Sequence, residues 1–420
     1  MELLIDKTNQ SSINKPVDTM LRGRDIVIIG LQPWYYDIGS NCKNIALQLA
    51  QHNRVLYINQ PINRKTYISR DKNKGIQQHC SVIKYGGGKI RFIKKNLWEN
   101  YPTCIVESIN GLPSTNVFSA FNYLNNKRFA KEIKKAVEYL SFKDVILFND
   151  NDIYNGYYLK KLLSPSLYVY YCRDFLQGYS YWKRHTTVLE PKLIKKADVV
   201  VANSIHYTEY CQLHNPNSYY IGQGYNDELF DADKDHQLPE DIKHISNPII
   251  GYVGAITSSR LDENIIRQIA SSHPDWSIVL VGPEDDDFKK SALHKVPNIH
   301  FIGRQPIQKL PEYVNAFDVC INPQLVNKVT EGNYPLKIDE YLSMGKPVVA
   351  TRTKEMKLFE SHTYLANKPE EYPALIEKAL AEDNSEKRNE RICFATKHTW
   401  TKSVNELYKA MSKHLIPKNS

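Results

Sequence analysis

The segment NYPLKIDEYLSMGKPVVAT, residues 333–351, contains two charged residues three positions apart, Lys337 and Glu340, whose types and spacing suit the binding of a charged ligand. Pro335 favours the start of a helix, which places Lys337 in the first turn, where free backbone N–H groups attract anions. A lysine there opposes the helix dipole unless an anion such as a diphosphate binds beside it. Glu340 follows on nearly the same face, where a carboxylate can accept hydrogen bonds from two ribose hydroxyls. The spacing therefore favours a site for a nucleoside diphosphate.

The alternative interpretation is an ordinary Lys–Glu pair on a solvated helix face, which contributes only about 0.3 kcal/mol to stability. Against it, most residues around the pair are apolar, and the helix runs through Gly345 into the apolar strand PVVAT. A helix of this kind is mostly buried, so its charged residues need a functional reason.

The elements that must position this pair are short apolar strands alternating with helices, on both sides of a break near Tyr225. Runs such as DIVIIG and DVVVA in the first half, and PIIGYV and SIVLVG in the second, are typical of buried parallel strands. We therefore predict an α/β fold with two Rossmann-like domains facing across a cleft, where ligands bind at the carboxyl ends of the strands. The predicted division is a polar tail (1–24), a first domain (25–225), a linker (226–246), a second domain (247–395) and a C-terminal helix with tail (396–420).

Composition is that of a globular protein. The chain has 420 residues, enough for two domains, with 42% hydrophobic and 24% charged residues. Its seven cysteines are scattered without a CxxC pair, which favours thiols in a reducing compartment over a disulfide framework or a zinc site. The first 24 residues lack the apolar segment of a signal peptide, and no apolar run of about 18 residues occurs. We expect a cytoplasmic protein.

Positive charge is concentrated in the first half. Residues 1–225 contain 30 Lys and Arg against 17 Asp and Glu, whereas residues 226–420 contain 25 against 29. This asymmetry favours contact of the first half with an anionic surface such as the inner face of a cell membrane. The alternative is lysines on the solvated faces of amphipathic helices. Nucleic acid would also fit the charge, but no recognised binding module supports it, so we expect no nucleic-acid partner.

The segment YPLKIDEYLSMGKPVVAT resembles the donor-nucleotide motif of GT-B-fold glycosyltransferases, P-x-K-x-x-E-Y-x-x-x-G-K-P-V-V. The segments PIIGYVGAI and VPNIHFIGRQPIQKLPEYVNAFDVCINP are similar to other parts of the donor domain in that family, and YYCRDF and YIGQGYNDELF to the acceptor domain. The resemblance covers residues 25–411. It implies the GT-B fold of bacterial cell-surface polysaccharide enzymes, with the acceptor in the first domain, the donor in the second, and the C-terminal helix crossing back to the first.

The resemblance also implies roles for single residues. Lys337 would bind the donor diphosphate and Glu340 the ribose, while Arg304 would contact the base or a phosphate. Gly254 would let the donor phosphates approach the backbone. The donor-binding set that the resemblance implies is Gly254, Arg304, Asn322, Pro323, Pro335, Leu336, Lys337 and Glu340.

Glu331 departs from the family pattern. Many retaining members have two glutamates separated by seven residues, whereas eight residues separate Glu331 from Glu340 here. Glu331 is therefore given no role, and both retention and inversion of the sugar configuration stay open.

Two carboxylates of the first half are candidates for the base that takes the acceptor proton. Asp174 follows the apolar strand SLYVYYC and should lie at the cleft end of the sheet, unless it caps a helix. Asp37 is the second candidate. Beside it, Trp34 and Tyr35 could stack on a sugar or prenyl group or belong to the core, and Gly39 precedes a predicted helix on the same acceptor side.

Asp150 and Asp152 form a D-x-D pattern after the strand DVILF, and such a pair can hold magnesium or manganese with phosphate oxygens. The pattern often arises by chance, and it lies in the half without the nucleotide motif. We expect no metal and no cofactor, with Lys337 and backbone amides neutralising the leaving diphosphate.

These observations together predict a metal-independent glycosyltransferase. It would move a sugar from a nucleotide-diphosphate sugar, with a UDP-sugar favoured, to a hydroxyl of a glycan or lipid-linked acceptor. Two alternatives stay open. One is a nucleotide-sugar epimerase of the same fold, which needs no acceptor, and the other is a non-catalytic nucleotide- or carbohydrate-binding protein.

Overall fold

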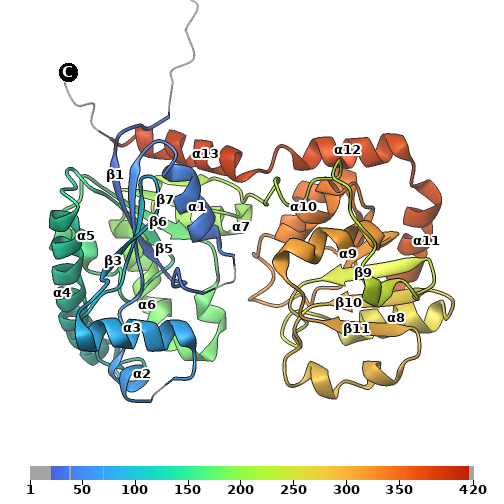
Figure 1. Ribbon diagram of the computed structural model, residues 1–420, viewed down its shortest axis with the longest axis horizontal. Coiled ribbons are helices and arrows are strands. Elements are labelled where there is room, and N and C mark those ends of the chain that lie inside the picture. Colours follow the sequence, from blue (N-terminus) through green and yellow to red (C-terminus); the bar gives the residue numbers. More distant parts are fainter. Residues whose placement is uncertain (1–19, 37–38, 70, 416–420) are drawn as a thin grey trace, which may run out of the picture.

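The computed structural model describes residues 20–36, 39–69 and 71–415, which form two α/β units (Figure 1). Within these residues the first sheet has eight strands: β1 (Asp25–Gly30), β2 (Arg54–Ile58), β3 (Ile90–Lys94), β4 (Leu97–Asn100), β5 (Ile146–Asp150), β6 (Leu167–Cys172), β7 (Val199–Ala202) and β8 (Ser218–Tyr220). Their order is β3-β4-β2-β1-β5-β6-β7-β8, and all neighbours are parallel except β3 and β4. Since β1, β5 and β6 are fully buried, these central strands are mostly apolar on both faces, with polar residues at the ends of β1 and β5.

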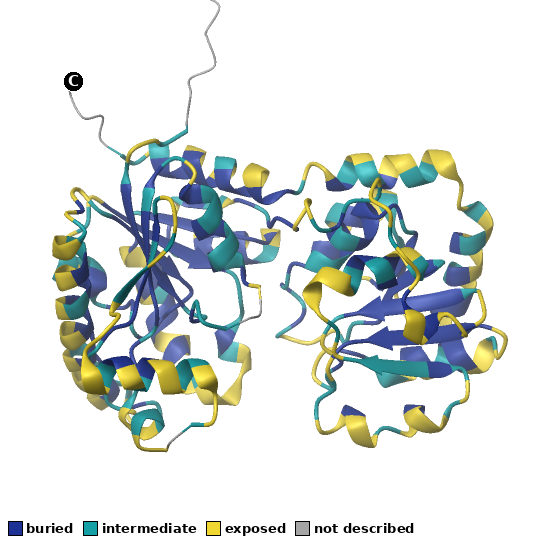
Figure 2. Cartoon of the chain, viewed as in Figure 1, coloured by how far each residue is buried: buried dark blue, intermediate teal, exposed yellow. Residues whose placement is uncertain are grey.

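Helices cover both faces of the first sheet (Figure 2). The helical segments of this unit are α1 (Asn41–Leu49), α2 (Arg64–Ser69), α3 (Lys74–Tyr85), α4 (Thr115–Tyr139), α5 (Leu159–Leu163), η1 (Leu176–Gly178), α6 (Ser180–Lys196) and α7 (Ile205–Gln212). Buried apolar side chains of α4, α6 and α7, such as Phe129 and Leu193, pack on one face. Ile45 and Leu49 of α1 pack on the other.

The second sheet is entirely parallel. Its strands, in the described residues, are β9 (Ile249–Val253), β10 (Ser277–Val281), β11 (Ile299–Gly303), β12 (Val319–Asn322), β13 (Val348–Thr351) and β14 (Tyr364–Ala366), in the order β11-β10-β9-β12-β13-β14. Its α-helices are α8 (Glu263–Ser272), α9 (Leu310–Ala316), α10 (Leu336–Ser343), α11 (Tyr372–Glu382) and α12 (Ser385–Ala395). Short 3-10 segments are η2 (Glu240–Ile242), η3 (Phe288–Lys290), η4 (Ala292–Lys295), η5 (Ile307–Lys309), η6 (Glu355–His362) and η7 (Pro369–Glu371). Helices α8 and α11 pack on one face of the sheet, and α9 and α10 on the other.

The chain passes between the two units at two segments that lie side by side. The backbone N–H of Tyr225 donates to the carbonyl of His398 (3.2 Å), and Tyr225 forms an isolated parallel bridge with Thr399. Helix α13 (Trp400–Ser412) then packs against α1 and the first sheet through residues such as Leu407. The C-terminal helix therefore crosses back to the first unit, as predicted.

Direct contacts also join the two units beside the cleft. The carboxylate of Glu355 accepts hydrogen bonds from the backbone N–H groups of Ile205 (3.2 Å) and His206 (2.8 Å), at the start of α7. The hydroxyl of Tyr207 donates to Asn333 Oδ1 (2.9 Å). A helix terminus of the first unit is thus satisfied by a side chain of the second.

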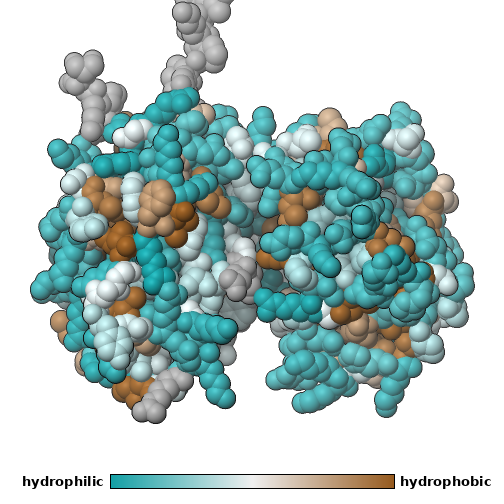
Figure 3. Space-filling view, viewed as in Figure 1, coloured by the Kyte–Doolittle hydropathy of each residue, from teal (hydrophilic) through white to brown (hydrophobic). Residues whose placement is uncertain are grey.

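The surface of both units is largely hydrophilic in the view shown, with small separate apolar areas (Figure 3). Among the described residues, no helix has the length and apolar character needed to cross a bilayer.

Candidate functional site

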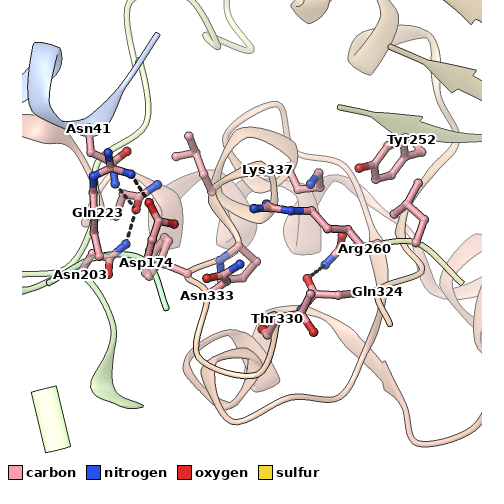
Figure 4. A pocket seen from close by; sticks show the side chains of 16 residues that line it. Asn41, Asp174, Asn203, Gln223, Tyr252, Arg260, Gln324, Thr330, Asn333 and Lys337 are labelled. Atoms are coloured by element: carbon pink, nitrogen blue, oxygen red, sulfur yellow. Dashed lines mark hydrogen bonds and ion pairs between the residues drawn. The ribbon is translucent and has the colours of Figure 1, made fainter. Parts of the chain in front are cut away.

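A cavity of about 260 Å³ lies between the two units, and both units contribute to its lining (Figure 4). From the first unit it is lined by Asn41, Arg173, Asp174, Asn203 and Gln223. From the second it is lined by Tyr252, Arg260, Leu261, Asn322, Gln324, Thr330, Asn333, Tyr334, Pro335, Leu336 and Lys337. We call this cavity the central pocket. A ligand that fills it touches both units at once.

Lys337 projects toward the central pocket from the first turn of α10, which begins at Leu336 with Pro335 at the N-cap position. Its ammonium lies 5.0 Å from the centre of the Tyr252 ring. Within the described part of the chain it forms neither an ion pair nor a hydrogen bond. An unpaired cation beside the N-terminus of a helix is well placed to bind an anion.

Gly254 is the residue that follows β9, and it lies next to the Lys337 side chain. Its φ of +147° lies outside the range that L side chains usually adopt. A Cβ atom there would lie 2.9 Å from the Tyr252 hydroxyl and 3.2 Å from Lys337 Cε. The absence of a side chain at this position is therefore what allows the lysine to lie against the backbone.

A second cation, Arg260, enters the pocket from the loop between β9 and α8. Its guanidinium is 3.4 Å from the hydroxyl of Tyr179, and no carboxylate pairs with it among the described residues. Arg304 lies elsewhere: it is exposed, follows the edge strand β11, and is not part of the pocket lining. The structure therefore brings Arg260, rather than Arg304, to Lys337.

Of the other residues predicted to bind the donor, some line the central pocket and some do not. Asn322, Pro335 and Leu336 line the central pocket, whereas Pro323 does not and uses its carbonyl to accept from Asp262 N (2.9 Å). Glu340 lies one turn beyond Lys337 on α10, outside the lining. Burial raises the pKa of Glu340 to about 8, with Lys337 opposing the rise and Asp339 adding to it.

The start of α10 is fixed by a buried carboxylate. Asp339 accepts hydrogen bonds from the Tyr334 hydroxyl (2.6 Å) and pairs with His398 Nδ1 (2.8 Å). Burial raises the pKa of Asp339, and both partners oppose that rise. Because His398 belongs to the segment that crosses between the units, the nucleotide-motif helix is tied to that crossing.

On the first-unit side, Asp174 is the carboxylate that lines the pocket among the described residues. It forms an ion pair with Arg173, whose Nε also pairs with the fully buried Asp150 (2.6 Å). Asp174 follows β6 at the cleft end of the sheet, and its side chain bonds to Arg173 rather than to a helix N-terminus. Its role as a base stays a prediction.

Comparison with known proteins supplies the family of the second unit. Residues 247–382 match the family model described as glycosyl transferases group 1. The second unit is a group 1 glycosyltransferase domain. A Bacillus subtilis (strain 168) protein, provisionally named teichuronic acid biosynthesis glycosyltransferase TuaH, is 28% identical over 203 residues, which are 46% of this chain. The match spans 51% of that relative, about half its length.

Solved structures show that the glycosyltransferase domain belongs to a complete GT-B fold. HepE of Anabaena in complex with UDP and glucose has a TM-score of 0.63 at 15% identity, over 93% of this chain and 100% of that one. Sucrose-phosphate synthase of Thermosynechococcus elongatus has a TM-score of 0.59 at 13% identity, over 93% and 95%. Trehalose-6-phosphate synthase OtsA has a TM-score of 0.65 at 10% identity, over 94% and 100%. At these identities the likeness concerns the fold alone, and it confirms the predicted two-unit architecture.

On the first unit, the residues predicted for the acceptor side also lie in different places, and only some of them line a cavity. Tyr35 lines a second cavity, of about 450 Å³, which shares Arg173 with the central pocket, and its ring stacks on Tyr101 (5.8 Å). Trp34 packs edge-on against Tyr57 (5.0 Å) at the border of the core. Gly39 is exposed before α1 and lines neither cavity. Asp37, the second candidate base, lies outside the described residues.

The D-x-D pattern of the first unit has a structural explanation. Asp150 accepts from the Leu31 backbone N–H (3.2 Å) in addition to its ion pair with Arg173. Asp152 is 1% exposed and accepts from Asn155 and Gln60. Both carboxylates therefore hold loops at the end of the sheet.

Sequence reasoning missed several residues of the central pocket. Arg260 could have been found, because it lies in the first strand-to-helix loop of the glycosyltransferase domain, where phosphates bind in such folds. Asn41, Asn203 and Gln223 carry no local signal, since they meet only when α1 and the segments after β7 and β8 come together.

Proposed function

We propose that this protein transfers a sugar from a nucleotide-diphosphate sugar, a UDP-sugar, to a hydroxyl of a glycan or lipid-linked acceptor during cell-surface polysaccharide synthesis. The observation that carries the proposal is the pair of cations Lys337 and Arg260, which face the central pocket without a carboxylate partner among the described residues. They lie at a helix N-terminus and in a strand-to-helix loop, two places where backbone N–H groups also attract a diphosphate.

The proposed reaction breaks the bond between the sugar C1 and the diphosphate oxygen and forms a bond from C1 to the acceptor oxygen. Lys337 and Arg260 stabilise the negative charge that develops on the leaving diphosphate. The acceptor hydroxyl loses its proton to a carboxylate, and Asp174 lines the pocket from the opposite wall. We propose no metal and no cofactor for this step.

The nature of donor and acceptor is supported by relatives. The name of the B. subtilis relative refers to teichuronic acid biosynthesis, and HepE was solved with UDP-glucose. For the acceptor, the cavity lined by Tyr35 meets the central pocket at Arg173. An acceptor lying there would bring its hydroxyl toward the donor.

Thermal-shift measurements with UDP-, GDP-, ADP- and dTDP-sugars test donor binding, because a ligand of the folded state raises the melting temperature. We expect a shift with UDP-sugars that Lys337→Ala abolishes. Lys309→Ala, which removes an exposed lysine of the same domain, should leave the shift intact. A shift that survives Lys337→Ala unchanged contradicts the assignment of the site.

The reaction itself is tested by product analysis. Transfer requires both donor and acceptor, so incubation with a UDP-sugar alone should leave the sugar configuration unchanged. A C2-inverted sugar nucleotide formed from the donor alone would identify an epimerase instead. Donor binding without turnover in the presence of membrane glycolipid extracts would favour a non-catalytic binding protein.

We further propose that the protein works at the inner, cytoplasmic face of the cell membrane, with its first unit toward the lipid. The outer face of α4 exposes Val117, Phe121 and Leu124, and about two turns further along it exposes Lys131 and Lys134. Apolar side chains next to cations favour an anionic lipid surface, where the former insert and the latter pair with headgroups.

Vesicle flotation tests this contact. We expect binding to vesicles containing phosphatidylglycerol, little binding to pure phosphatidylcholine, and release as salt is raised. The double variant Lys131→Glu with Lys134→Glu should weaken flotation, whereas Lys289→Glu with Lys290→Glu on the second unit should not. Equal loss in both double variants would contradict the proposed surface.

A further inference from the structure

The first-unit wall of the central pocket carries a cluster of three amide side chains, which we call the amide cluster: Asn41, Asn203 and Gln223 (Figure 4). Gln223 Oε1 accepts hydrogen bonds from Asn41 Nδ2 (2.7 Å) and from Asn203 Nδ2 (2.8 Å). The three residues come from the start of α1 and from the segments after β7 and β8, so the fold rather than the local sequence assembles them.

The amide cluster has hydrogen-bonding capacity left over. Asn203 is 3% exposed, and its buried Oδ1 has no hydrogen-bond partner in the described part of the chain. Neither Gln223 Nε2 nor Asn41 Oδ1 has a partner there. A buried amide oxygen without a partner is costly and uncommon in native proteins. Because the Asn203 side chain lines the central pocket, a ligand held there is a source of the missing donor.

The two walls of the pocket differ in chemistry. The second-unit wall carries the cations Lys337 and Arg260, which suit a diphosphate. The amide cluster carries no formal charge and offers two acceptors and an N–H donor group side by side. Hydroxyls of a sugar ring both donate and accept, so adjacent hydroxyls match this alternation, whereas a phosphate, which only accepts, does not.

We propose that the amide cluster binds the hydroxyls of the sugar carried by the nucleotide, and so selects the sugar of the donor. The inference rests on the proposed function, because it assumes that the diphosphate lies against Lys337 and Arg260. The sugar then bridges from the second unit to the first and lies beside Asp174, which lines the same wall. Donor selection would therefore depend on residues of the unit that lacks the nucleotide motif.

Calorimetric titration of UDP and of four UDP-sugars (glucose, galactose, N-acetylglucosamine and glucuronic acid) tests the proposal. We expect the wild type to bind at least one UDP-sugar more tightly than UDP. Asn203→Ala and Gln223→Ala should each weaken that UDP-sugar about tenfold, which corresponds to about 1.4 kcal/mol, while changing UDP affinity less than about twofold. Asn41→Ala, at a partly exposed position, provides a third variant if either of the others fails to fold.

The matched control is Asn215→Ala. Asn215 is also a buried amide of the first unit, but its Nδ2 donates to the carbonyls of Ile194 and Ala197, away from the pocket. It should leave the difference between UDP and UDP-sugar unchanged.

Three results would overturn the inference about the amide cluster. They are equal losses for UDP and UDP-sugar in the Asn203 and Gln223 variants, no loss for either, or a wild type that binds UDP but no UDP-sugar more tightly. A wild type that binds neither UDP nor any other nucleotide would instead refute the proposed function. The two failures are therefore distinguishable.

Discussion

The two walls of the central pocket are built in different ways. On the second unit, six lining residues lie within the eight residues 330–337 and belong to one loop and the first turn of α10. On the first unit, Asn41, Asp174, Asn203 and Gln223 come from separate segments after different strands. One wall is therefore a local sequence motif, whereas the other exists only in the folded sheet. A single substitution in the first-unit wall therefore leaves the sequence motif of the second-unit wall unchanged.

If the first-unit wall does the proton chemistry, Asp174→Asn should have the largest effect. Loss of a general base lowers kcat by about 10²–10⁴-fold, and UDP affinity should stay unchanged because the cations of the other wall are untouched. Steady-state kinetics with a membrane glycolipid acceptor, together with UDP titration, measures both. Asp198→Asn is the control, because Asp198 pairs with Lys160 outside the pocket. Full activity of Asp174→Asn would assign the base elsewhere.

The second-unit wall is tested by comparing two arginines. Arg260→Ala should weaken UDP binding by about 10–100-fold, since a hydrogen bond to a charged group contributes about 1.5–3 kcal/mol. Arg304→Ala should change it less than about twofold, because Arg304 is exposed and outside the pocket. The reverse order of effects, measured by calorimetric titration, would show that the nucleotide lies toward β11.

A smaller effect should follow from Glu340, whose pKa burial raises to about 8. If ribose hydroxyls donate to the ionised carboxylate, UDP affinity rises as the pH rises through about 8, by up to about tenfold between pH 7 and 9. Glu340→Gln should bind weakly and show no such rise. The same pH dependence in Glu340→Gln would exclude this carboxylate as its source.

The smallest effect concerns the contact between the units. Burial raises the pKa of Glu355 above 4.5, so its contribution to stability is full below that value and is lost as the pH rises through its folded pKa. Thermal unfolding should therefore show the wild type losing stability relative to Glu355→Gln as the pH rises above about 4.5. Glu360→Gln is the control, for which the pH dependence of stability has the opposite sign. The hydrogen bond from Arg352 lowers the pKa of Glu360, so the contribution of Glu360 to stability is lost as the pH falls. A flat difference between the wild type and Glu355→Gln would contradict the buried contact.

The sequence predicted what is local. Alternating strands and helices indicated two parallel sheets, and the proline at residue 335 marked the start of α10 to within one residue. The position of Lys337 followed from that start. The start of this helix and the place of Lys337 in its first turn both follow from residues of one short segment.

What the sequence did not predict depends on contacts between distant segments. Arg304 stands next to a family-like segment, yet β11 is an edge strand and carries it away from the pocket, while Arg260 follows the central strand β9. The Asn203–Gln223 pair joins residues 20 positions apart, and Asn41 is 182 positions from Gln223. The hydrophobic periodicity of the sequence gives no information on contacts between residues that lie so far apart in the chain.

The hydrogen bond between His398 and Asp339 has a consequence for how the molecule moves. It fastens the first turns of α10, where the nucleotide would lie, to the segment that crosses between the units, so that any rotation of the units about this crossing acts on α10. A nucleotide that holds α10 in place therefore also restricts that rotation. By thermodynamic reciprocity, a change that favours the angle of the nucleotide-bound state raises nucleotide affinity, and a change that favours another angle lowers it.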